Sequence, residues 1–390
     1  MFQNKKILLG VTGGIAAYKA VDLASRLTKL GAEVYTIMTT NACELISPVT
    51  FKSITHQKVV TKMFDPNADI EHISLADWAD IVIIAPATAN IIGKVAHGIA
   101  DDLLSTTIMA TTAPVCFVPA MNIHMYENPI VQENVANLTE HGYFFMEPEF
   151  GKLACGYEGK GRFPKTQEIV YFLHTHLNYK RDLIGKKILI TAGASREEID
   201  PMRFITNHSS GKMGIALARA AHFRGAEVTL IHSVVTEEIP EYLNAIKTIS
   251  AKEMYEAVLR EFPKNEIVIK AAAVADYTPA IKAVQKIKKK DSLNLELTGT
   301  KDILAELGKQ KKADQILVGF AAESENIIQN AKEKLEKKNL DFIAANDLSV
   351  SGKDNTEIIL LGKKTELKLS GTKFEVAHQI LDQILGKKSE

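Results

Sequence analysis

Apolar residues along the chain alternate between short continuous runs and longer segments in which they recur every three or four positions. Residues 7–9 form such a run, which enters a glycine-rich loop at residues 10–14, and a helical spacing follows from Ala17 to Leu30. Gly31 is placed to end that helix, and residues 33–38 form the next apolar run. This part of the chain therefore predicts a strand, a glycine loop, a helix and a second strand.

The same order of elements recurs in the second half of the chain. Residues 186–193 form a strand that enters a glycine loop, and residues 215–223 have helical spacing. Residues 225–230 (GAEVTL) then echo residues 31–36 (GAEVYT). Each copy is followed by a continuous apolar run ending in small residues, at 81–87 and at 267–273. Alternating strands and helices predict an α/β fold with two doubly wound, mostly parallel, Rossmann-like sheets. Ligands of such folds bind beyond the carboxyl ends of the strands.

The domain boundary is expected in the polar, basic stretch at residues 179–185. A chain of 390 residues is too long for one hydrophobic core, and we expect domains at residues 1–182 and 183–390. Residues 147–164 contain several glycines and no periodic pattern. A long irregular segment within a compact domain is typically functional or disordered, so we expect an irregular loop of one of these two kinds there.

The composition excludes several classes of protein. Hydrophobic residues make up 46% of the chain, and the 47 basic side chains balance 47 acidic ones. A balanced charge gives no general attraction to nucleic acid or to a membrane surface. No run is apolar enough to span a bilayer, the start does not read as a signal peptide, and the three cysteines have no paired spacing. We expect a cytoplasmic protein that acts on small molecules, with neither nucleic acid nor membrane as partner.

Two loops are candidates for binding an anion. The loop at residues 10–14 lacks the dinucleotide fingerprint, and its glycines suit either a phosphate or a plain tight turn. Residues 209–214 (SSGKMG) are similar to a P-loop, but Thr206 stands where that loop requires glycine and Met213 where it requires a hydroxyl. The second loop fits an anion at a helix N-terminus or a capping serine.

Cys155 is the candidate nucleophile or proton donor. It lies within the glycine-rich segment, whereas Cys116 lies in the apolar run at residues 115–118 and is interpreted as core. A thiol with an ordinary pKa of about 8.5 is mostly protonated at neutral pH, which favours a proton donor. A structural role for Cys155 stays open.

Other polar side chains stand at strand ends or beside helices. Asn122 follows the strand at 115–118 and suits a carboxylate or amide, although asparagine is also an ordinary turn residue. His72 could transfer protons near neutral pH or simply be a surface residue. Asp276 could accept ribose hydroxyls. Lysines at 286 and 288–290, with Lys334 and Lys338 four positions apart, suit either a polyanion site or a solvated surface.

Together these segments resemble the bacterial bifunctional family of phosphopantothenoylcysteine decarboxylases and phosphopantothenate–cysteine ligases of coenzyme A biosynthesis. The similarity runs from about residue 5 to about residue 350. In the first half it rests on residues 13–16 (GGIA), 86–90 (PATAN), 119–122 (PAMN) and 154–156 (ACG). In the second half it rests on residues 200–203 (DPMR), 207–214 (NHSSGKMG), 271–276 (AAAVAD), 286–289 (KIKK), 319–323 (GFAAE), 339–341 (NLD) and 345–347 (AND).

For the first half, the resemblance implies a flavin-dependent cysteine decarboxylase. The flavin would oxidise the cysteinyl thiol of the substrate by two electrons, and carbon dioxide would leave. The reduced flavin would then return the two electrons while Cys155 donates a proton. His72 would take part in proton transfer, Asn122 would hold the departing carboxylate, and a loop around Cys155 would close over the substrate. The implied FMN-binding residues are Gly13, Gly14, Ile15, Thr39, Pro86, Ala87, Thr88, Asn90, Ser105 and Met121.

For the second half, the resemblance implies a ligase. CTP would activate 4'-phosphopantothenate as an acyl-cytidylate, with Mg²⁺ present, and the cysteine amine would then attack it. Asn207 would act in the acyl-cytidylate step, with Asp276 at the ribose and Lys286 at the base; the metal ligands stay unassigned. The implied nucleotide residues are Ser209, Ser210, Gly211, Lys212, Ala271, Ala272, Asp276, Lys286, Asp302, Ile303, Leu304, Phe320, Lys334 and Lys338.

The chain departs from the family pattern at two places. Residues 193–196 read GASR where the pattern usually has GPTR, and Lys301 stands where proline is common. Lys301 is therefore expected to add a cation near the nucleotide. The resemblance also implies a homo-oligomer with trimer-based flavin domains and dimeric ligase domains.

Three other functions compete with this interpretation. One is a flavin-dependent decarboxylase of another cysteinyl substrate, such as a peptide, which would have no need of a triphosphate site. Another is an NAD(P) dehydrogenase, although the chain has neither the glycine fingerprint nor a Tyr-x-x-x-Lys pair. The third is a non-enzymatic flavoprotein regulator, for which substitution of Cys155 should have no effect on activity.

Overall fold

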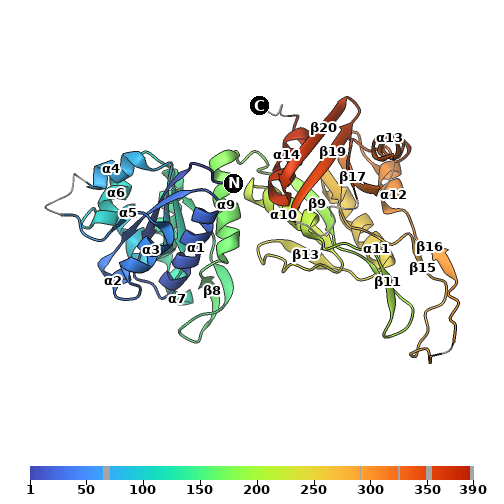
Figure 1. The fold of residues 1–390 in the computed structure, drawn as a ribbon, viewed down its shortest axis with the longest axis horizontal. Coiled ribbons are helices and arrows are strands. Elements are labelled where there is room, and N and C mark those ends of the chain that lie inside the picture. Colours follow the sequence, from blue (N-terminus) through green and yellow to red (C-terminus); the bar gives the residue numbers. More distant parts are fainter. Residues whose placement is uncertain (65–70, 290, 324–325, 348–353, 387–390) are drawn as a thin grey trace. The chain divides into compact units, whose positions relative to one another are not determined.

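The computed structural model describes residues 1–64, 71–289, 291–323, 326–347 and 354–386. These residues belong to two compact units, Met1–Asn178 and Tyr179–Glu390 (Figure 1). The sequence-based division at residues 182 and 183, which assigns one activity to each part, stays a prediction. Among the described residues, no helix is long and apolar enough to cross a membrane.

A six-stranded parallel sheet forms the centre of the first unit, with the strand order β3-β2-β1-β4-β5-β6. The order reverses between β1 and β4, which creates the crevice where ligands of doubly wound sheets bind. The strands are β1 (Lys6–Val11), β2 (Glu33–Met38), β3 (Val59–Val60), β4 (Ile81–Ala87), β5 (Val115–Pro119) and β6 (Phe144–Phe145). The helices are α1 (Ala17–Lys29), α2 (Thr40–Cys43), α3 (Pro48–Thr55), α4 (Glu71–Trp78), α5 (Ala89–Ala96), α6 (Leu103–Ala110), α7 (Ile123–Tyr126), α8 (Pro129–Glu140) and α9 (Thr166–Asn178).

The hydrophobic pattern explains why these elements form. Every residue of β4 is buried, as expected for a strand covered on both faces. In α1 the buried residues recur at helical spacing from Ala17 to Leu27, and Gly31 follows with a φ of +95°, which a residue with a side chain rarely adopts. The doubly wound fold predicted from the sequence is confirmed in both units.

The glycine-rich segment at residues 147–164 is more regular than expected. It forms an antiparallel hairpin of β7 (Glu149–Lys152) and β8 (Glu158–Arg162). Its glycines allow β8 to approach a neighbouring loop: a Cβ at Gly161 would lie 2.3 Å from the Met121 carbonyl oxygen, and one at Gly159 2.0 Å from Ile123 Cδ1. The expectation of an irregular loop was wrong because these glycines serve close packing, which leaves no alternating pattern.

An eight-stranded sheet forms the second unit, in the order β13-β12-β9-β14-β17-β18-β19-β20. Its strands are parallel up to β18, and β19 and β20 add an antiparallel hairpin. The strands are β9 (Lys187–Ala192), β12 (Glu227–His232), β13 (Asn244–Lys247), β14 (Ile267–Lys270), β17 (Ile316–Glu323), β18 (Phe342–Asp347), β19 (Asn355–Gly362) and β20 (Thr365–Thr372). The helices are α10 (Lys212–Phe223), α11 (Ala251–Glu261), α12 (Ile303–Gln310), α13 (Ile327–Lys337) and α14 (Lys373–Ile384), with a 3-10 turn at Phe262–Lys264. Two small antiparallel pairs complete the unit: β10 (Arg196–Glu198) with β11 (Phe204–Thr206), and β15 (Tyr277–Pro279) with β16 (Leu297–Gly299).

A buried ionic cluster fixes the first residues of the second unit to its helices. Arg224, at the end of α10, has no exposed side-chain surface and contacts Asp182 through two hydrogen bonds of 2.8 and 2.9 Å. Its third contact is with Asp382 of α14, at 2.8 Å. The ring of Tyr179 stacks on His378 with a centroid distance of 3.9 Å, and burial raises the pKa of Tyr179 to about 12. Tyr179 and Asp182 therefore pack against the helices of this unit, whereas Lys180 and Arg181 between them are exposed.

Candidate functional site

In the first unit, the ends of β1 and β4 are joined by a threonine. The hydroxyl of Thr12 donates to the Pro86 carbonyl oxygen at 2.7 Å and accepts from the Thr88 N–H at 3.2 Å. A Cβ at Gly14 would lie 3.5 Å from Thr88 Cγ2 and 3.7 Å from Pro86 Cγ, and one at Gly13 would collide with Asn41. The loop after β1 therefore lies against the loop after β4, at the crevice predicted for a ligand.

The other predicted flavin residues lie at or near the same strand ends. The N–H of Thr39 donates to the Val11 carbonyl oxygen at 3.0 Å, beside the end of β1, and the N–H of Met121 donates to Gly161 at 3.0 Å. Ile15 is 63% exposed. The remaining residues of the predicted set are Ala87 at the end of β4 and Asn90 in the first turn of α5.

Ser105 differs from these residues. It is fully buried, and its hydroxyl forms a capping box with Asp102 at the start of α6, with a Ser105 N–H to Asp102 Oδ1 distance of 2.8 Å. The hydroxyl therefore stabilises a helix in this structure. Its predicted contact with a flavin stays a prediction.

Cys155 and Asn122 are brought together by the β7–β8 hairpin. Asn122 caps α7 by accepting the His124 N–H at 2.8 Å, and its amide nitrogen donates to Cys155 Sγ at 3.2 Å. The thiol is exposed, and hydrogen bonds from the Tyr157 backbone and the Asn122 amide lower its pKa. These donors stabilise the thiolate that remains after a thiol gives up a proton, which suits a proton donor.

His72 is not joined to this pair. It lies partly buried on α4. Among the described residues, no hydrogen bond or ion pair links His72 to Cys155 or Asn122. Its role in proton transfer stays a prediction.

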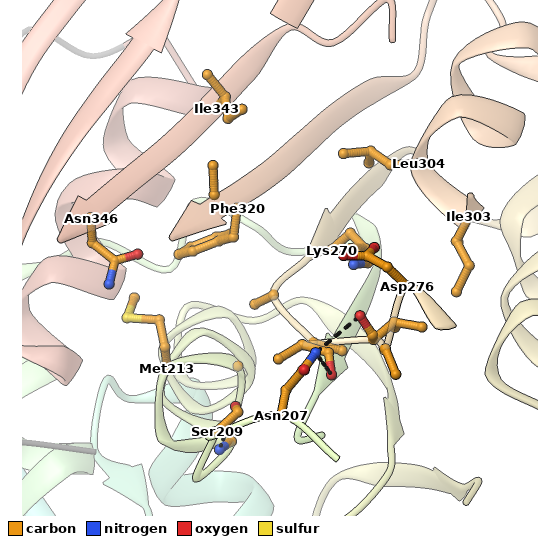
Figure 2. Close-up of a pocket in the computed structure, with 18 of the residues that line it drawn as sticks. Asn207, Ser209, Met213, Lys270, Asp276, Ile303, Leu304, Phe320, Ile343 and Asn346 are labelled. Carbon is orange, nitrogen blue, oxygen red and sulfur yellow. Dashed lines mark hydrogen bonds between the residues drawn. The ribbon is translucent and has the colours of Figure 1, made fainter. Parts of the chain in front are cut away.

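In the second unit, the strand-end loops surround a cavity of about 390 Å³. In Figure 2, Asn346, Phe320 and Met213 lie on one side of it, and Lys270, Asp276 and Ile303 on the other. The predicted residues that line the cavity are Asn207, Ser209, Ser210, Gly211, Lys212, Ala271, Ala272, Asp276, Asp302, Ile303, Leu304, Phe320, Lys334 and Lys338. Their proximity makes one shared ligand possible, and their individual roles stay predictions.

The framework of the cavity repeats the arrangement of the first unit. At the end of β9, the Thr191 hydroxyl accepts the Ala272 N–H at 3.1 Å, and the Ala273 N–H donates to Gly193 at 2.8 Å. The side-chain amide of Asn207 donates to the Val274 carbonyl oxygen at 3.2 Å, one of the dashed lines in Figure 2. Two loops that are distant in sequence thereby form one wall.

Lys286 is the predicted nucleotide residue that does not line the cavity. It is exposed in the irregular stretch between β15 and β16. The next residue, Ile287, is held by its backbone: its N–H donates to Asp200 Oδ2 at 3.0 Å and its carbonyl accepts from Arg203 at 2.7 Å. The pair of Asp200 and Arg203 thus keeps this stretch at a turn outside the cavity. Lys290, at the end of the lysine run, lies outside the described residues.

Charged side chains gather in and around the cavity. Lys338 Nζ lies 2.8 Å from Asp302 Oδ2, and Asp302 caps α12 through the Ala305 N–H at 3.0 Å. Burial raises the pKa of Asp302, but these hydrogen bonds outweigh it and leave the pKa lowered. At the α10 side, Lys212 Nζ lies 2.5 Å from Asp354 Oδ1. Such an array of lysines suits a polyanionic ligand.

Sequence reasoning missed several residues of the cavity wall. Thr356 and Ile358 come from β19, and Lys373 begins α14, beyond the last motif that carried the family resemblance. Lys270 also lines the cavity, as does Asn346, which belongs to the motif at residues 345–347 but had no predicted role. A signal existed for Lys270, because it is the one charged residue in the apolar run at 267–273.

Lys301 borders the cavity, but its ammonium group contacts an aromatic ring. Its ammonium group lies over the Tyr255 ring, 4.8 Å from the centroid. A cation–π contact of this kind holds the ammonium at the ring. Among the described residues, no group of three or more His, Cys, Asp or Glu side chains could hold a metal ion.

Comparisons with known proteins agree over the whole chain. A flavoprotein family model matches residues 1–178, and the model of the DNA/pantothenate metabolism flavoprotein C-terminal domain matches residues 183–387. The chain is 49% identical over 398 residues to the coenzyme A biosynthesis bifunctional protein CoaBC of Bacillus subtilis, across 98% of this chain and 97% of the relative. It is 41% identical to the protein of that name from Escherichia coli, across 99% of this chain and 98% of the relative.

A solved structure is also similar to about half of this chain. The crystal structure of the C-terminal domain of a coenzyme A biosynthesis bifunctional protein CoaBC aligns with 52% of this chain and 95% of its own, with 42% identity and a TM-score of 0.45. The full-length relatives and the two family models together cover both units. The chain therefore belongs to the family of coenzyme A biosynthesis bifunctional proteins.

Proposed function

We propose that this chain makes 4'-phosphopantetheine in two steps. The second unit joins cysteine to 4'-phosphopantothenate with CTP, and the first unit decarboxylates the resulting phosphopantothenoylcysteine with FMN. The observation that carries this proposal is the presence of two different sites in one chain: an exposed thiol hydrogen-bonded to Asn122 in a flavoprotein unit, and a lysine-rich cavity in the second unit.

The residues of the first unit fit a flavin. The glycines after β1 leave room beside Pro86 and Thr88, where added side chains would fill the crevice. Gly13, Gly14 and the loop at residues 86–90 would hold FMN, which supplies reversible two-electron oxidation of the substrate thiol when bound. The Asn122 amide can hold the departing carboxylate. Cys155 can then deliver a proton to the substrate carbon from which the carboxylate has left.

The second unit meets the needs of carboxylate activation. A carboxylate is a poor electrophile until its oxygen becomes part of a leaving group, and transfer of a cytidylyl group from CTP provides one. Lys334 and Lys338 can offset the charge of the phosphate chain, and Asn207 lies on the wall formed by residues 273 and 274. We propose Mg²⁺ as the companion of CTP, held mainly by phosphate oxygens and water.

The chemistry fixes the order of the two steps. The substrate of the first unit contains an amide between a pantothenoyl group and cysteine, which is the product of the second unit. The unit that comes second in the chain therefore acts first. A decarboxylase of cysteinyl peptides would make the second unit superfluous, and a regulator would need neither site.

Purified protein is expected to be yellow and to release pyrophosphate from CTP only when 4'-phosphopantothenate is present. The colour follows from bound flavin, and the dependence follows from transfer of the cytidylyl group to a carboxylate. Absorbance near the flavin bands and a coupled pyrophosphate assay measure the two properties. Colourless protein would refute the function of the first unit, and pyrophosphate release without the acid would refute that of the second.

Lys301→Met is expected to change the KM for CTP by less than about twofold. The ammonium group of Lys301 is held over Tyr255, so its loss removes little charge from the cavity. Steady-state pyrophosphate release at varied CTP measures the effect. A tenfold rise in KM would instead support the expectation from sequence that Lys301 contacts the nucleotide.

The remaining expectations concern assembly and location. We propose a homo-oligomer with trimer-based flavin domains and dimeric ligase domains, acting in the cytoplasm. Exposed apolar side chains such as Ile15, Tyr18 and Ile130 are of the kind that subunit interfaces bury. Three free cysteines suit a reducing compartment.

A further inference from the structure

Lys270 is the one charged residue of strand β14, whose other three residues are apolar. Strand β14 lies between β9 and β17, and Val268 and Ala272, two positions away on either side, are buried in the hydrophobic core. Lys270 ends the strand and reaches the cavity wall, on the same side as Asp276 in Figure 2. Among the described residues, its ammonium group has neither a hydrogen bond nor an ion pair shorter than 4 Å.

A charged group at such a place is unfavourable for the protein without ligand. Burial, and next the charge of Lys338, lower the pKa of Lys270 from 10.5 to about 8, although Asp302 and Asp276 act in the opposite direction. Lys270 is therefore still mostly protonated at neutral pH. A side chain kept charged at this cost, and left without a partner, is available for an anionic ligand.

The surrounding charges indicate which ligand Lys270 can serve. Asp276 and Asp302 would repel a polyanion, and Lys338 is already paired with Asp302 at 2.8 Å. Lys334 and Lys338 both belong to the α13 side of the cavity. On the β14 side, Lys270 is placed to offset the two carboxylates, so that a chain of phosphates can lie between the two groups of lysines.

We propose that Lys270 binds the phosphate chain of the nucleoside triphosphate in this cavity. The inference rests on the proposed ligase function and adds a specific contact to it. The ammonium group donates hydrogen bonds to phosphate oxygens, and its charge counters that of Asp276 and Asp302. A competing role, acceptance of a proton from the attacking amine, would leave nucleotide affinity untouched.

Nucleotide binding to the full-length protein tests the contact directly. Lys270→Met keeps the length of the side chain without its charge, and it is expected to weaken CTP binding about tenfold in calorimetric titrations, as for the loss of a charge-assisted hydrogen bond. The loss should shrink from CTP through CDP to CMP, because fewer phosphates remain. Lys337→Met, on the exposed face of α13, removes the same charge outside the cavity and should bind CTP like the wild type.

The pH dependence gives a second readout. Lys270 is protonated below its pKa of about 8, so CTP affinity of the wild type should fall as the pH rises through that range. The charged groups that face Lys270 are Asp276, Asp302, Lys334 and Lys338. In Lys270→Met, the decrease in CTP affinity near pH 8 should be absent. In Lys270→Arg, whose side chain stays charged, the decrease should occur at higher pH.

Stability without nucleotide separates binding from misfolding. Folding disfavours the protonated form of Lys270, and this cost is complete below about pH 8 and vanishes as the pH rises towards 10.5. Lys270→Met should therefore raise the Tm of the nucleotide-free protein at pH 7 while it weakens CTP binding. If that variant does not fold, Lys270→Arg still tests the pH shift.

Several outcomes would overturn the proposal. Unchanged CTP affinity in Lys270→Met, or equal losses with CTP and CMP, would refute a phosphate contact. A reduced rate of amide formation at saturating CTP with normal affinity would instead identify a proton acceptor. A wild type that binds no CTP would refute the ligase function itself, and is thereby distinguished from failure of the Lys270 contact alone.

Discussion

Cys155→Ser is expected to reduce decarboxylation of phosphopantothenoylcysteine at least a hundredfold, as for the loss of a positioned proton donor. A serine hydroxyl is far less acidic than a thiol, so the donors at Asn122 and the Tyr157 backbone can no longer assist release of the proton. Product formation measured by mass spectrometry reports the loss. The flavin spectrum and CTP-dependent ligation should be unchanged, because Cys155 belongs to a surface hairpin of the first unit.

Cys43→Ser provides the matched control for this experiment. Cys43 is also a free thiol of the first unit, but it lies in α2 and not in the β7–β8 hairpin whose thiol is hydrogen-bonded to Asn122. Its serine variant should decarboxylate like the wild type. Full turnover by Cys155→Ser would show that the thiol donates no essential proton, and would leave the hairpin a structural role only.

Arg224→Met is expected to destabilise the second unit by about 3 kcal/mol, in the range found when one partner of a buried ion pair is removed. The change leaves Asp182 and Asp382 partly buried without their cation, at side-chain exposures of 18% and 25%. Denaturant unfolding followed by circular dichroism should show the loss. The only tryptophan, Trp78, belongs to the first unit, so tryptophan fluorescence should report an unchanged transition there.

Arg260→Met is the control for charge removal in this unit. Arg260 pairs with Glu261 at 3.4 Å and is 61% exposed. An exposed pair contributes little, so the variant should lose no more than about 0.5 kcal/mol. Equal effects of the two substitutions, or a shift in the tryptophan transition with Arg224→Met, would contradict the structural role assigned to the buried cluster.

The sheets could be predicted because their signals are local. Continuous apolar runs such as 81–87 indicate strands that are buried on both faces. The helical spacing between these runs predicts helices that cover both faces, which is the doubly wound arrangement. The β7–β8 hairpin could not be predicted in the same way. Gly159 and Gly161 are dictated by contacts with residues 121–123, which are distant in sequence.

The sequence predicts those parts of the candidate site in which a motif lies at the end of a strand or the start of a helix. Parallel strands place their carboxyl ends and the N-termini of the following helices at one edge. Residues 271–276 follow β14 and residues 209–214 lead into α10, and both segments line the cavity there. Lys373 and Thr356 could not be found this way, because a C-terminal hairpin and helix without a motif carry them to the cavity. Lys286 lies outside the cavity because Asp200 and Arg203 hold the backbone of the next residue, Ile287. No local sequence pattern predicts that contact.

The buried cluster around Arg224 also bears on how the two activities can be separated by genetic engineering. Tyr179 and Asp182 precede the first strand of the second unit, yet the ring of one and the carboxylate of the other are packed into it. A gene fragment that encodes the ligase alone should therefore begin no later than residue 179. A chimaera that joins this flavoprotein unit to a foreign ligase should end at residue 178, so that each folded piece keeps its own stabilising contacts.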